Sequence, residues 1–338
     1  MGCQFYSGIE GGAKSYTVAM PKYTFGRGCL AEAGPRASSH GIRRAALFTD
    51  PHLREGPYVS TVCDSLRASG IEFDIFSDIR IEPDDDTVIL ASNFLAQGRH
   101  DGVISVGGGS VMDSAKAAMV YARYPADFNH YFGPPVGPGI PVPGPVLPHL
   151  ACPTTSGTGS ECTSVAVIRI NSFNTKFVIG SPHLLPDEAL VDPSVCDSLP
   201  ANIIASTGFD LLCHAIECYT AKAYTNWSRV DDPLARTMLQ GANPWSDMAA
   251  RQALEIVGKY IVRGVSDSSD REARDSLMFG ASLAGMAFGN SGTHLPHAMS
   301  YGITHLMKDI TTDGYNVASP FVPHGISVTV NAPAIFRY

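Results

Sequence analysis

The segment at residues 103–116, VISVGGGSVMDSAK, constrains the fold of this chain strongly. It joins a short apolar run, typical of a buried strand, to three glycines and the start of a helix. Further strand-like runs at 45–49, 72–76 and 150–152 alternate with a helical pattern at 59–69. This alternation predicts a parallel sheet covered by helices.

The second half of the chain has a different pattern, because helical periodicity dominates from about Ala205 onward. We expect helices over residues 208–223, 246–263, 270–288 and 324–338. A strand-like segment ends just before Pro200, which places the boundary there. The sequence therefore predicts two domains, an α/β domain over 1–200 and a helical domain over 201–338.

Local signals refine these expectations. Ser246 or Asp247 is expected to cap the second helix, and Ser268 or Asp270 the third. Residues 133–148 are too rich in proline and glycine for a helix or a central strand. We expect an extended surface loop there.

Composition excludes several classes of function. The net charge is −8 and no cluster of Lys and Arg appears, which argues against a nucleic-acid surface. No apolar run approaches the roughly 20 residues that a membrane-spanning helix needs. The eight cysteines form no C-x-x-C pair, so we expect reduced, mostly buried thiols.

The glycine segment is a candidate anion site. Gly107, Gly108 and Gly109 let the backbone approach a bulky anion, and Ser110 is expected to cap the following helix, with Asp113 at the capping-box spacing. The free N–H groups of a helix start favour a pyrophosphate. An ordinary strand–helix turn is the competing interpretation, since the G-x-G-x-x-G pattern is absent.

A second loop, PTTSGTGSECT at 153–163, favours a dinucleotide site shared by both loops. Thr154, Thr155 and Thr158 offer hydroxyls to phosphate or ribose oxygens. Asp50 ends a strand, where its carboxylate suits an adenosine ribose and favours NAD over NADP. Taken alone, Asp50 is equally a turn residue.

Four side chains suggest a metal site. Asp210 and His214 are spaced i,i+4, so both leave the same face of a helix, and His297 and His324 lie beside small residues. One carboxylate and three imidazoles suit Fe(II) or Zn(II). His294 is a rival third histidine, and Glu217 is expected to support a ligand or the structure.

These motifs resemble the iron-containing (group III) alcohol dehydrogenases. GGGSVMDSAK, PTTSGTGSE, GFDLLCHAIE, HAMSY and VPHG occur in the family's order along nearly the whole chain. The resemblance implies a Rossmann-like N-terminal domain and an incomplete all-α C-terminal domain, in a dehydroquinate synthase-like architecture. It implies Fe(II), or Zn(II), on Asp210, His214, His297 and His324. Its implied NAD contacts are Asp50, Gly108, Gly109, Ser110, Asp113, Thr154, Thr155, Thr158, Thr163 and Lys176.

Within the family, the chain is most similar to the hydroxyacid–oxoacid transhydrogenase branch. The resemblance implies hydride transfer from 4-hydroxybutyrate through bound NAD to 2-oxoglutarate, giving succinate semialdehyde and 2-hydroxyglutarate. Tyr301 stands where many members have a second histidine, and its hydroxyl is the candidate proton acceptor. The resemblance also implies a mitochondrial location, and a homodimer is one expectation for assembly.

Two other functions stay open at this point. One is an ordinary NAD-dependent alcohol dehydrogenase acting on simple alcohols. The other is an inactive remnant, because roughly the last hundred residues of a family member are expected beyond Tyr338.

Overall fold

The computed structural model describes residues 3–307, 310, 312–315 and 321–337. The chain forms two compact units, each built from separate segments. The sheet unit comprises Pro21–Thr155 and Ser164–Val195. The helical unit comprises Met1–Met20, Ser156–Thr163 and Cys196–Tyr338.

The sheet unit contains a six-stranded sheet in the order β1-β8-β5-β4-β2-β3. Its strands are β1 (Lys22–Phe25), β2 (Arg44–Phe48), β3 (Glu72–Phe76), β4 (Gly102–Gly107), β5 (His149–Pro153) and β8 (Glu188–Val191). All neighbouring strands in this sheet pair in parallel. The predicted parallel sheet is confirmed.

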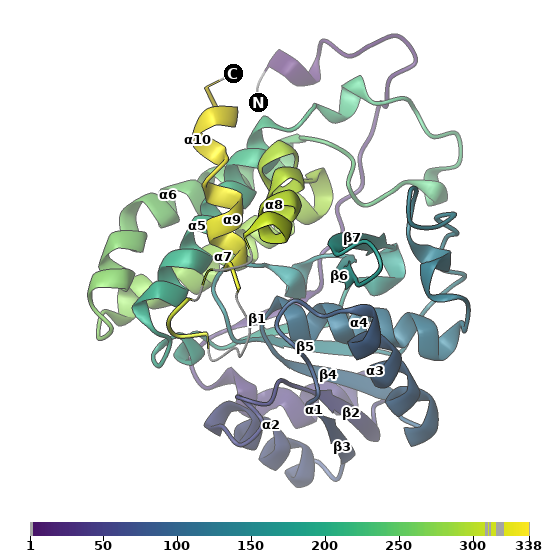
Figure 1. Ribbon diagram of the computed structural model, residues 1–338, viewed down its shortest axis with the longest axis vertical. Helices are drawn as coiled ribbons and strands as arrows, with labels where there is room; N and C mark the ends of the chain where they lie inside the picture. The colour runs from purple at the N-terminus through teal and green to yellow at the C-terminus, as the bar shows by residue number, and fades with distance from the viewer. Residues whose placement is uncertain (1–2, 308–309, 311, 316–320, 338) are drawn as a thin grey trace. The chain divides into compact units, whose positions relative to one another are not determined.

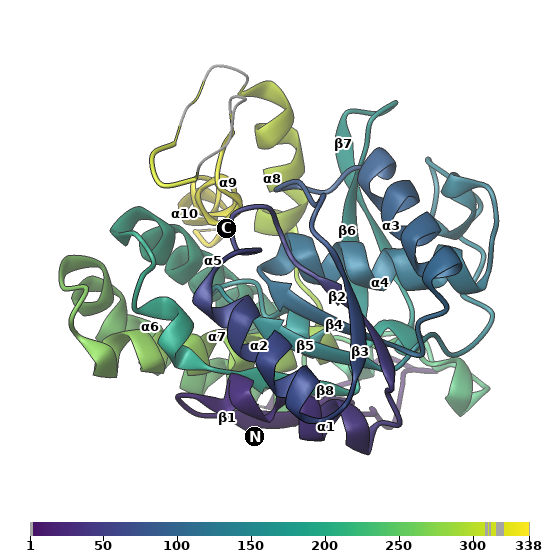
Figure 2. The same cartoon turned by 90° about the horizontal axis from the view of Figure 1, so that it is seen from below.

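Helices cover both sides of this sheet. They are α1 (Ala33–Ser39), α2 (Pro57–Ala68), α3 (Asp85–Gly98) and α4 (Gly109–Arg123). Helices α1 and α2 lie on one side and α3 and α4 on the other (Figures 1 and 2). On the α3–α4 side, Phe48 and Val103 from the sheet pack with Met119 in one buried cluster. An antiparallel hairpin of β6 (Val165–Ile170) and β7 (Thr175–Gly180) packs against α4.

The helical unit is built around three long helices. These are α5 (Ala201–Thr220), α6 (Pro244–Ser266) and α7 (Arg271–Ser291), which all contact one another. Three shorter helices follow, α8 (Leu295–Leu306), α9 (His324–Thr329) and α10 (Ala332–Ile335), and α9 packs on α5 and α8. The 156–163 loop joins this unit, where Glu161 accepts a 2.7 Å hydrogen bond from Ser282 of α7.

Some predicted details differ from the structure. The predicted helix over 324–338 is two short helices, because Pro333 suits only the start of a new helix. Asn243, and not Ser246 or Asp247, caps α6, since its side chain accepts from the Ser246 N–H. Asp270 caps α7 as expected, accepting from the Ala273 N–H.

The loop at 133–148 has no helix or strand, as predicted, but it is not wholly a surface loop. Val136 and Val142 are buried in the cluster formed by α4, β6 and β7. Seven cysteines are buried free thiols, as expected: Cys29, Cys63, Cys152, Cys162, Cys196, Cys213 and Cys218.

The predicted domains, 1–200 and 201–338, cut the chain once, whereas the compact units exchange segments. The boundary near residue 200 stays a prediction, and it lies between β8 and α5.

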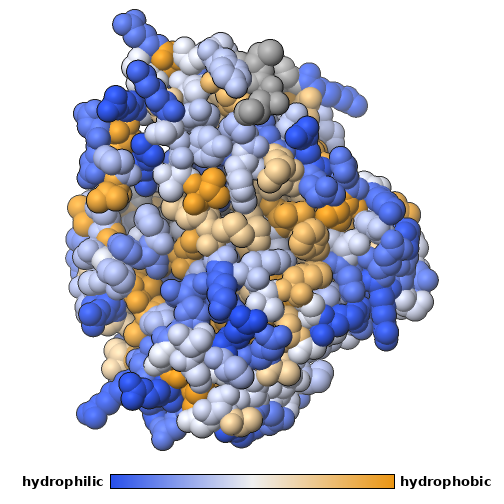
Figure 3. All heavy atoms as spheres, turned by 180° about the vertical axis from the view of Figure 1, so that it is seen from behind, coloured by the Kyte–Doolittle hydropathy of each residue, from blue (hydrophilic) through white to orange (hydrophobic). Residues whose placement is uncertain are grey.

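On the face drawn in Figure 3, hydrophilic side chains are interspersed with small hydrophobic groups. In the described part of the chain, no helix has the length and apolar character needed to cross a membrane.

Candidate active site

Helix α5 places three polar side chains on one buried face. Asp210, His214 and Glu217 follow one another at i, i+4 and i+7, so they project on the same side of the helix. Their exposed fractions are 2%, 4% and 0%. Burying a polar group without a partner costs free energy, so these three side chains need partners. The neighbouring helices supply them.

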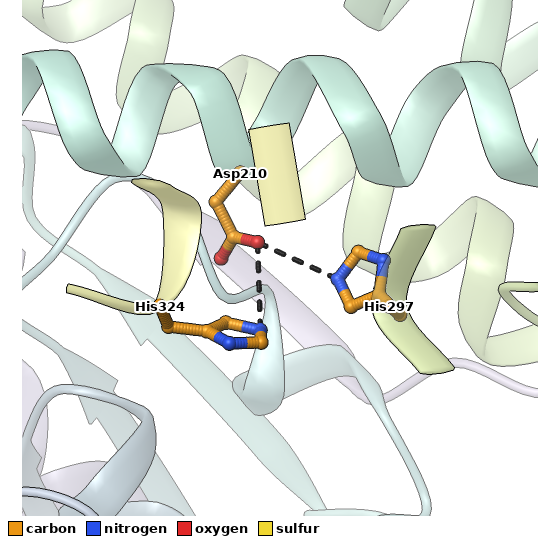
Figure 4. A group of neighbouring side chains, drawn as sticks. All are labelled: Asp210, His297 and His324. Carbon is orange, nitrogen blue, oxygen red and sulfur yellow. Dashed lines mark ion pairs between the residues drawn. The ribbon is translucent and has the colours of Figure 1, made fainter. Parts of the chain in front are cut away.

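Two histidines from other helices complete the cluster. His297 of α8 and His324 of α9 turn their rings toward Asp210 (Figure 4). Their Nε2 atoms lie 3.5 and 3.6 Å from Asp210 Oδ1. One ligand atom from each residue lies within 4.8 Å of the others, which is a spacing that can hold a metal ion. The structure therefore brings together three of the four predicted ligands.

His214, the fourth predicted ligand, lies beside this group but not in it. Its Nδ1 is 3.8 Å from Asp210 Oδ1, and its ring stacks on His297 at 4.3 Å and on Phe288 at 4.2 Å. Burial lowers the pKa of His214 to about 4, outweighing the attraction of Asp210, so its imidazole is neutral at pH 7. Its role as a ligand stays a prediction.

Glu217 fixes the orientation of His297. Its Oε1 accepts from His297 Nδ1 at 2.5 Å, and its Oε2 accepts from the His294 N–H at 2.6 Å. Burial alone would raise the pKa of Glu217, but the hydrogen bond and charge of His297 lower it. Because Nδ1 donates to Glu217, the Nε2 of a neutral His297 is an acceptor that faces Asp210.

This arrangement fits a cation. Among the described residues, neither Asp210 Oδ1 nor His297 Nε2 has a hydrogen-bond partner, although both atoms are buried. Two acceptors 3.5 Å apart repel each other unless a positive charge lies near both. Without a metal, a proton on His297 supplies that charge: burial opposes it, but Asp210 and Glu217 raise the pKa of His297 to about 9. A metal ion would take the place of this proton on Nε2. The same surroundings keep the pKa of Asp210 well below its usual range: burial opposes this, but His214, His324 and His297 prevail.

The rival histidine is engaged elsewhere. The ring Nε2 of His294 lies 2.9 Å from Thr220 Oγ1, and its backbone N–H is bound to Glu217. His294 is therefore a neighbour of the cluster and not part of its ligand group. Tyr301, the predicted proton acceptor, lies half-buried one helical turn after His297 on α8.

Gly325 lets α9 approach α5 at this site. A Cβ at Gly325 would lie 1.9 Å from Ser206 O and 3.1 Å from Asp210 Cβ. We expect Gly325→Ala to displace α9 with His324 and to weaken Zn(II) binding by at least about ten-fold. Titration of the metal-free protein with Zn(II) measures this.

The matched control is Gly258→Ala on α6, where no atom lies within 4 Å of the added Cβ. This variant should bind Zn(II) like the wild type, and it should be slightly more stable because alanine favours a helix. Equal Zn(II) affinity in both variants would show that α9 does not hold a ligand.

The glycine loop leads into α4 with a different cap from the predicted one. Gly108 is the N-cap residue and makes no side-chain capping bond, while Ser110 lies inside the first turn. The Ser110 hydroxyl instead accepts from the Glu82 N–H at 3.2 Å. Asp113 makes no capping box, because its carboxylate accepts from the Val167 N–H at 2.9 Å. The free N–H groups at the start of α4 remain suited to an anion.

The threonines of the second loop fall in both units. Thr154 and Thr155 belong to the sheet unit, and Thr158 and Thr163 to the helical unit. Thr155 lies against Gly108, where an added Cβ would meet its side chain at 3.3 Å. Its hydroxyl is buried without a partner among the described residues, as expected where a ligand supplies one. Thr158 Oγ1 accepts from the Ser160 N–H, and Thr163 Oγ1 donates to Ser160 O.

The other predicted nucleotide contacts have partners within the protein. Asp50 follows β2 and accepts from the N–H groups of His52 and Leu53, so it closes a turn. Lys176 on β7 donates to Glu82 Oε1 at 2.5 Å. No motif or spacing pointed to Glu82, which is 94 residues from Lys176 in the chain.

Comparisons with known proteins agree with this geometry. The family model for "Iron-containing alcohol dehydrogenase" matches residues 21–193, and that for "Fe-containing alcohol dehydrogenase family, C-terminal" matches 235–338. The mouse (Mus musculus) protein "Hydroxyacid-oxoacid transhydrogenase, mitochondrial" is 41% identical over 326 residues, which cover 96% of this chain and 70% of the mouse protein. The chain belongs to the iron-containing alcohol dehydrogenase family. As a member of this family, it is an oxidoreductase that acts on a small-molecule substrate.

Solved structures support the same family. A 1,3-propanediol oxidoreductase is 30% identical with a TM-score of 0.82, covering 96% of this chain and 76% of that chain. Sulfoacetaldehyde reductase from Bifidobacterium kashiwanohense, solved with NAD+, is 27% identical with a TM-score of 0.79, covering 96% and 77%. The predicted fold class, an α/β part with a parallel sheet plus a helical part, is confirmed.

Proposed function

We propose that this iron-type alcohol dehydrogenase relative is a hydroxyacid–oxoacid transhydrogenase. The proposed reaction takes hydride from 4-hydroxybutyrate and delivers it, through bound NAD, to 2-oxoglutarate. The products are succinate semialdehyde and 2-hydroxyglutarate, so the two half-reactions balance in electrons and protons. The 41% identity to the mouse hydroxyacid-oxoacid transhydrogenase supports a hydroxyacid as hydride donor and an oxoacid as acceptor.

The main support for a metal site is the pair of Asp210 Oδ1 and His297 Nε2, two buried atoms that lie 3.5 Å apart without hydrogen-bond partners among the described residues. We propose that Asp210, His214, His297 and His324 hold Fe(II), or Zn(II). One carboxylate and three imidazoles suit these ions. A bound ion of this kind supplies Lewis acidity toward a substrate oxygen.

The protein's own groups then have separate tasks. Glu217 keeps the Nδ1 proton of His297 in place, which leaves Nε2 free to bind. Tyr301 is proposed to accept the proton of the substrate hydroxyl.

The proposed nucleotide site uses the start of α4 and the buried Thr155 hydroxyl. The structure of the NAD+ complex of sulfoacetaldehyde reductase, a relative, supports NAD as the nucleotide. The proposed contacts are those implied by the resemblance: Asp50, Gly108, Gly109, Ser110, Asp113, Thr154, Thr155, Thr158, Thr163 and Lys176.

A labelling experiment tests the transhydrogenase directly. Metal-loaded protein receives 4-hydroxybutyrate deuterated at C4, together with 2-oxoglutarate and no added nicotinamide. We expect 2-hydroxyglutarate carrying one deuterium at C2, measured by mass spectrometry, because the hydride does not exchange with water. Asp210→Asn should give no labelled product.

The alternative activity gives a different result. The likeness to 1,3-propanediol oxidoreductase favours an NAD-dependent dehydrogenase of simple alcohols. Such an enzyme would form no 2-hydroxyglutarate without added NAD, but it would reduce free NAD+ with an alcohol. Absence of both reactions, with metal bound, would contradict either activity for this chain.

We also propose a mitochondrial location and a homodimer. The mouse relative is named as a mitochondrial protein, and this supports the location. Fractionation of cells and light scattering of the purified protein test the two proposals.

A further inference from the structure

Glu82 has an unusual backbone conformation next to the proposed nucleotide site. Its φ is 59°, in the left-handed region that few residues other than glycine adopt. Such a conformation persists only where the surroundings hold it, and it is common at functional sites.

Contacts from three elements hold this segment. The Glu82 N–H donates to Ser110 Oγ in the first turn of α4, at 3.2 Å. The Glu82 carboxylate accepts from Lys176 of β7, at 2.5 Å. The next residue, Pro83, accepts through its carbonyl from the Arg169 N–H of β6, at 2.8 Å.

Glu82 therefore joins two residues that the proposed function assigns to NAD. The hydrogen bond from the Glu82 N–H occupies a lone pair of the Ser110 hydroxyl, so the hydroxyl proton is left to donate to another acceptor. The start of α4 also favours an anion, and the Ser110 proton adds a donor there.

The carboxylate acts on Lys176 in a different way. The two side chains are only 10% and 19% exposed, so the ion pair is well shielded. One of the three ammonium donors binds Glu82, which leaves two donors on a side chain whose position is already fixed. The pair is neutral overall, which suits the uncharged hydroxyls of a ribose better than a phosphate.

We propose that Glu82 is the positioning residue of the nucleotide site, which orders Lys176 for the hydroxyls of the cofactor's second ribose, the one that carries nicotinamide. This inference rests on the proposed function. Without Glu82, the Lys176 side chain would become ordered only when the nucleotide binds, and this loss of conformational entropy would weaken the binding.

Three ligands separate this role from a general loss of structure. ADP lacks the second ribose, ADP-ribose contains it, and NADH adds the nicotinamide. We expect Glu82→Gln to weaken ADP-ribose and NADH binding by about ten-fold, the effect of one charge-assisted hydrogen bond. ADP binding should change by less than about two-fold. Calorimetric titration of the full chain measures all three.

A double-mutant cycle tests whether Glu82 acts through Lys176. Lys176→Met should weaken ADP-ribose binding, and adding Glu82→Gln to it should cause little further loss. Glu72→Gln is the matched control, because it breaks an exposed ion pair with Arg44 in the same unit. This control should bind all three ligands like the wild type.

The possible failures are distinct. If the wild type binds neither NADH nor ADP, the nucleotide site itself is wrong and the role of Glu82 falls with it. If the wild type binds NADH and Glu82→Gln binds it equally well, only the role of Glu82 is overturned. Equal losses for ADP and ADP-ribose would show that Glu82 merely supports the fold.

Discussion

Replacing Asp210 by asparagine is expected to lower Zn(II) or Fe(II) affinity by more than about 100-fold, and oxidoreductase activity with it. Loss of a partner outside the ligand set costs about 10- to 100-fold, and loss of the central anion should exceed this. Asp210 Oδ1 lies 3.8, 3.5 and 3.6 Å from nitrogen atoms of His214, His297 and His324. An asparagine keeps the side chain's size but removes the negative charge that these three imidazoles share.

Metal content after dialysis, measured by mass spectrometry, checks this expectation. Asp231→Asn is the control, because Asp231 is exposed in the same unit. Glu217→Gln supplies an intermediate step, since it removes the negative charge beside His297 and leaves one acceptor oxygen for the two N–H groups of His294 and His297. It leaves the three-residue group intact. Full metal retention by Asp210→Asn would contradict the proposed centre.

The sequence predicted the part of this centre that lies on one helix. Asp210 and His214 share a face because of their i,i+4 spacing, and the helix formed as expected. The approach of His297 and His324 depends on how α8 and α9 pack, which no local spacing encodes. Small neighbouring residues suggested His297 and His324 as ligands, and the resemblance to a family then implied the same two residues.

The same limit applies to the fold. Three of the four long periodic segments correspond to the long helices α5, α6 and α7, whereas β1 and β8 were missed, since each has only four residues. Residue Glu188 lies within β8 and is completely buried beside Arg36, His40 and Lys22, so its strand does not look apolar. The sequence predicted Ser110 as a helix cap, but in the structure its hydroxyl accepts a hydrogen bond from the Glu82 N–H.

Replacing Arg274 by methionine is expected to destabilise the metal-free protein by about 3 kcal/mol. Arg274 is 1% exposed, and its Nη1 donates to the carbonyls of Cys196, Asp197 and Leu199. The Cys196 bond is fully buried, so its loss carries the whole desolvation penalty of about 1–3 kcal/mol. The carbonyls of Asp197 and Leu199 are partly buried, so water can replace part of the hydrogen bonding that they lose with Arg274.

Thermal unfolding of the metal-free protein measures this loss, because a bound ion would otherwise mask it. For a chain of 338 residues, whose unfolding entropy is about 0.7 kcal/mol/K, about 3 kcal/mol corresponds to a fall in Tm of roughly 4 °C. Arg271→Met is the matched control on the same helix, since Arg271 is exposed at the first turn of α7. Its Tm should stay the same or rise slightly, because a positive charge near a helix start is unfavourable. Equal Tm values for the two variants would mean that Arg274 does not fasten α7 to the segment that leads into α5, the helix that carries Asp210.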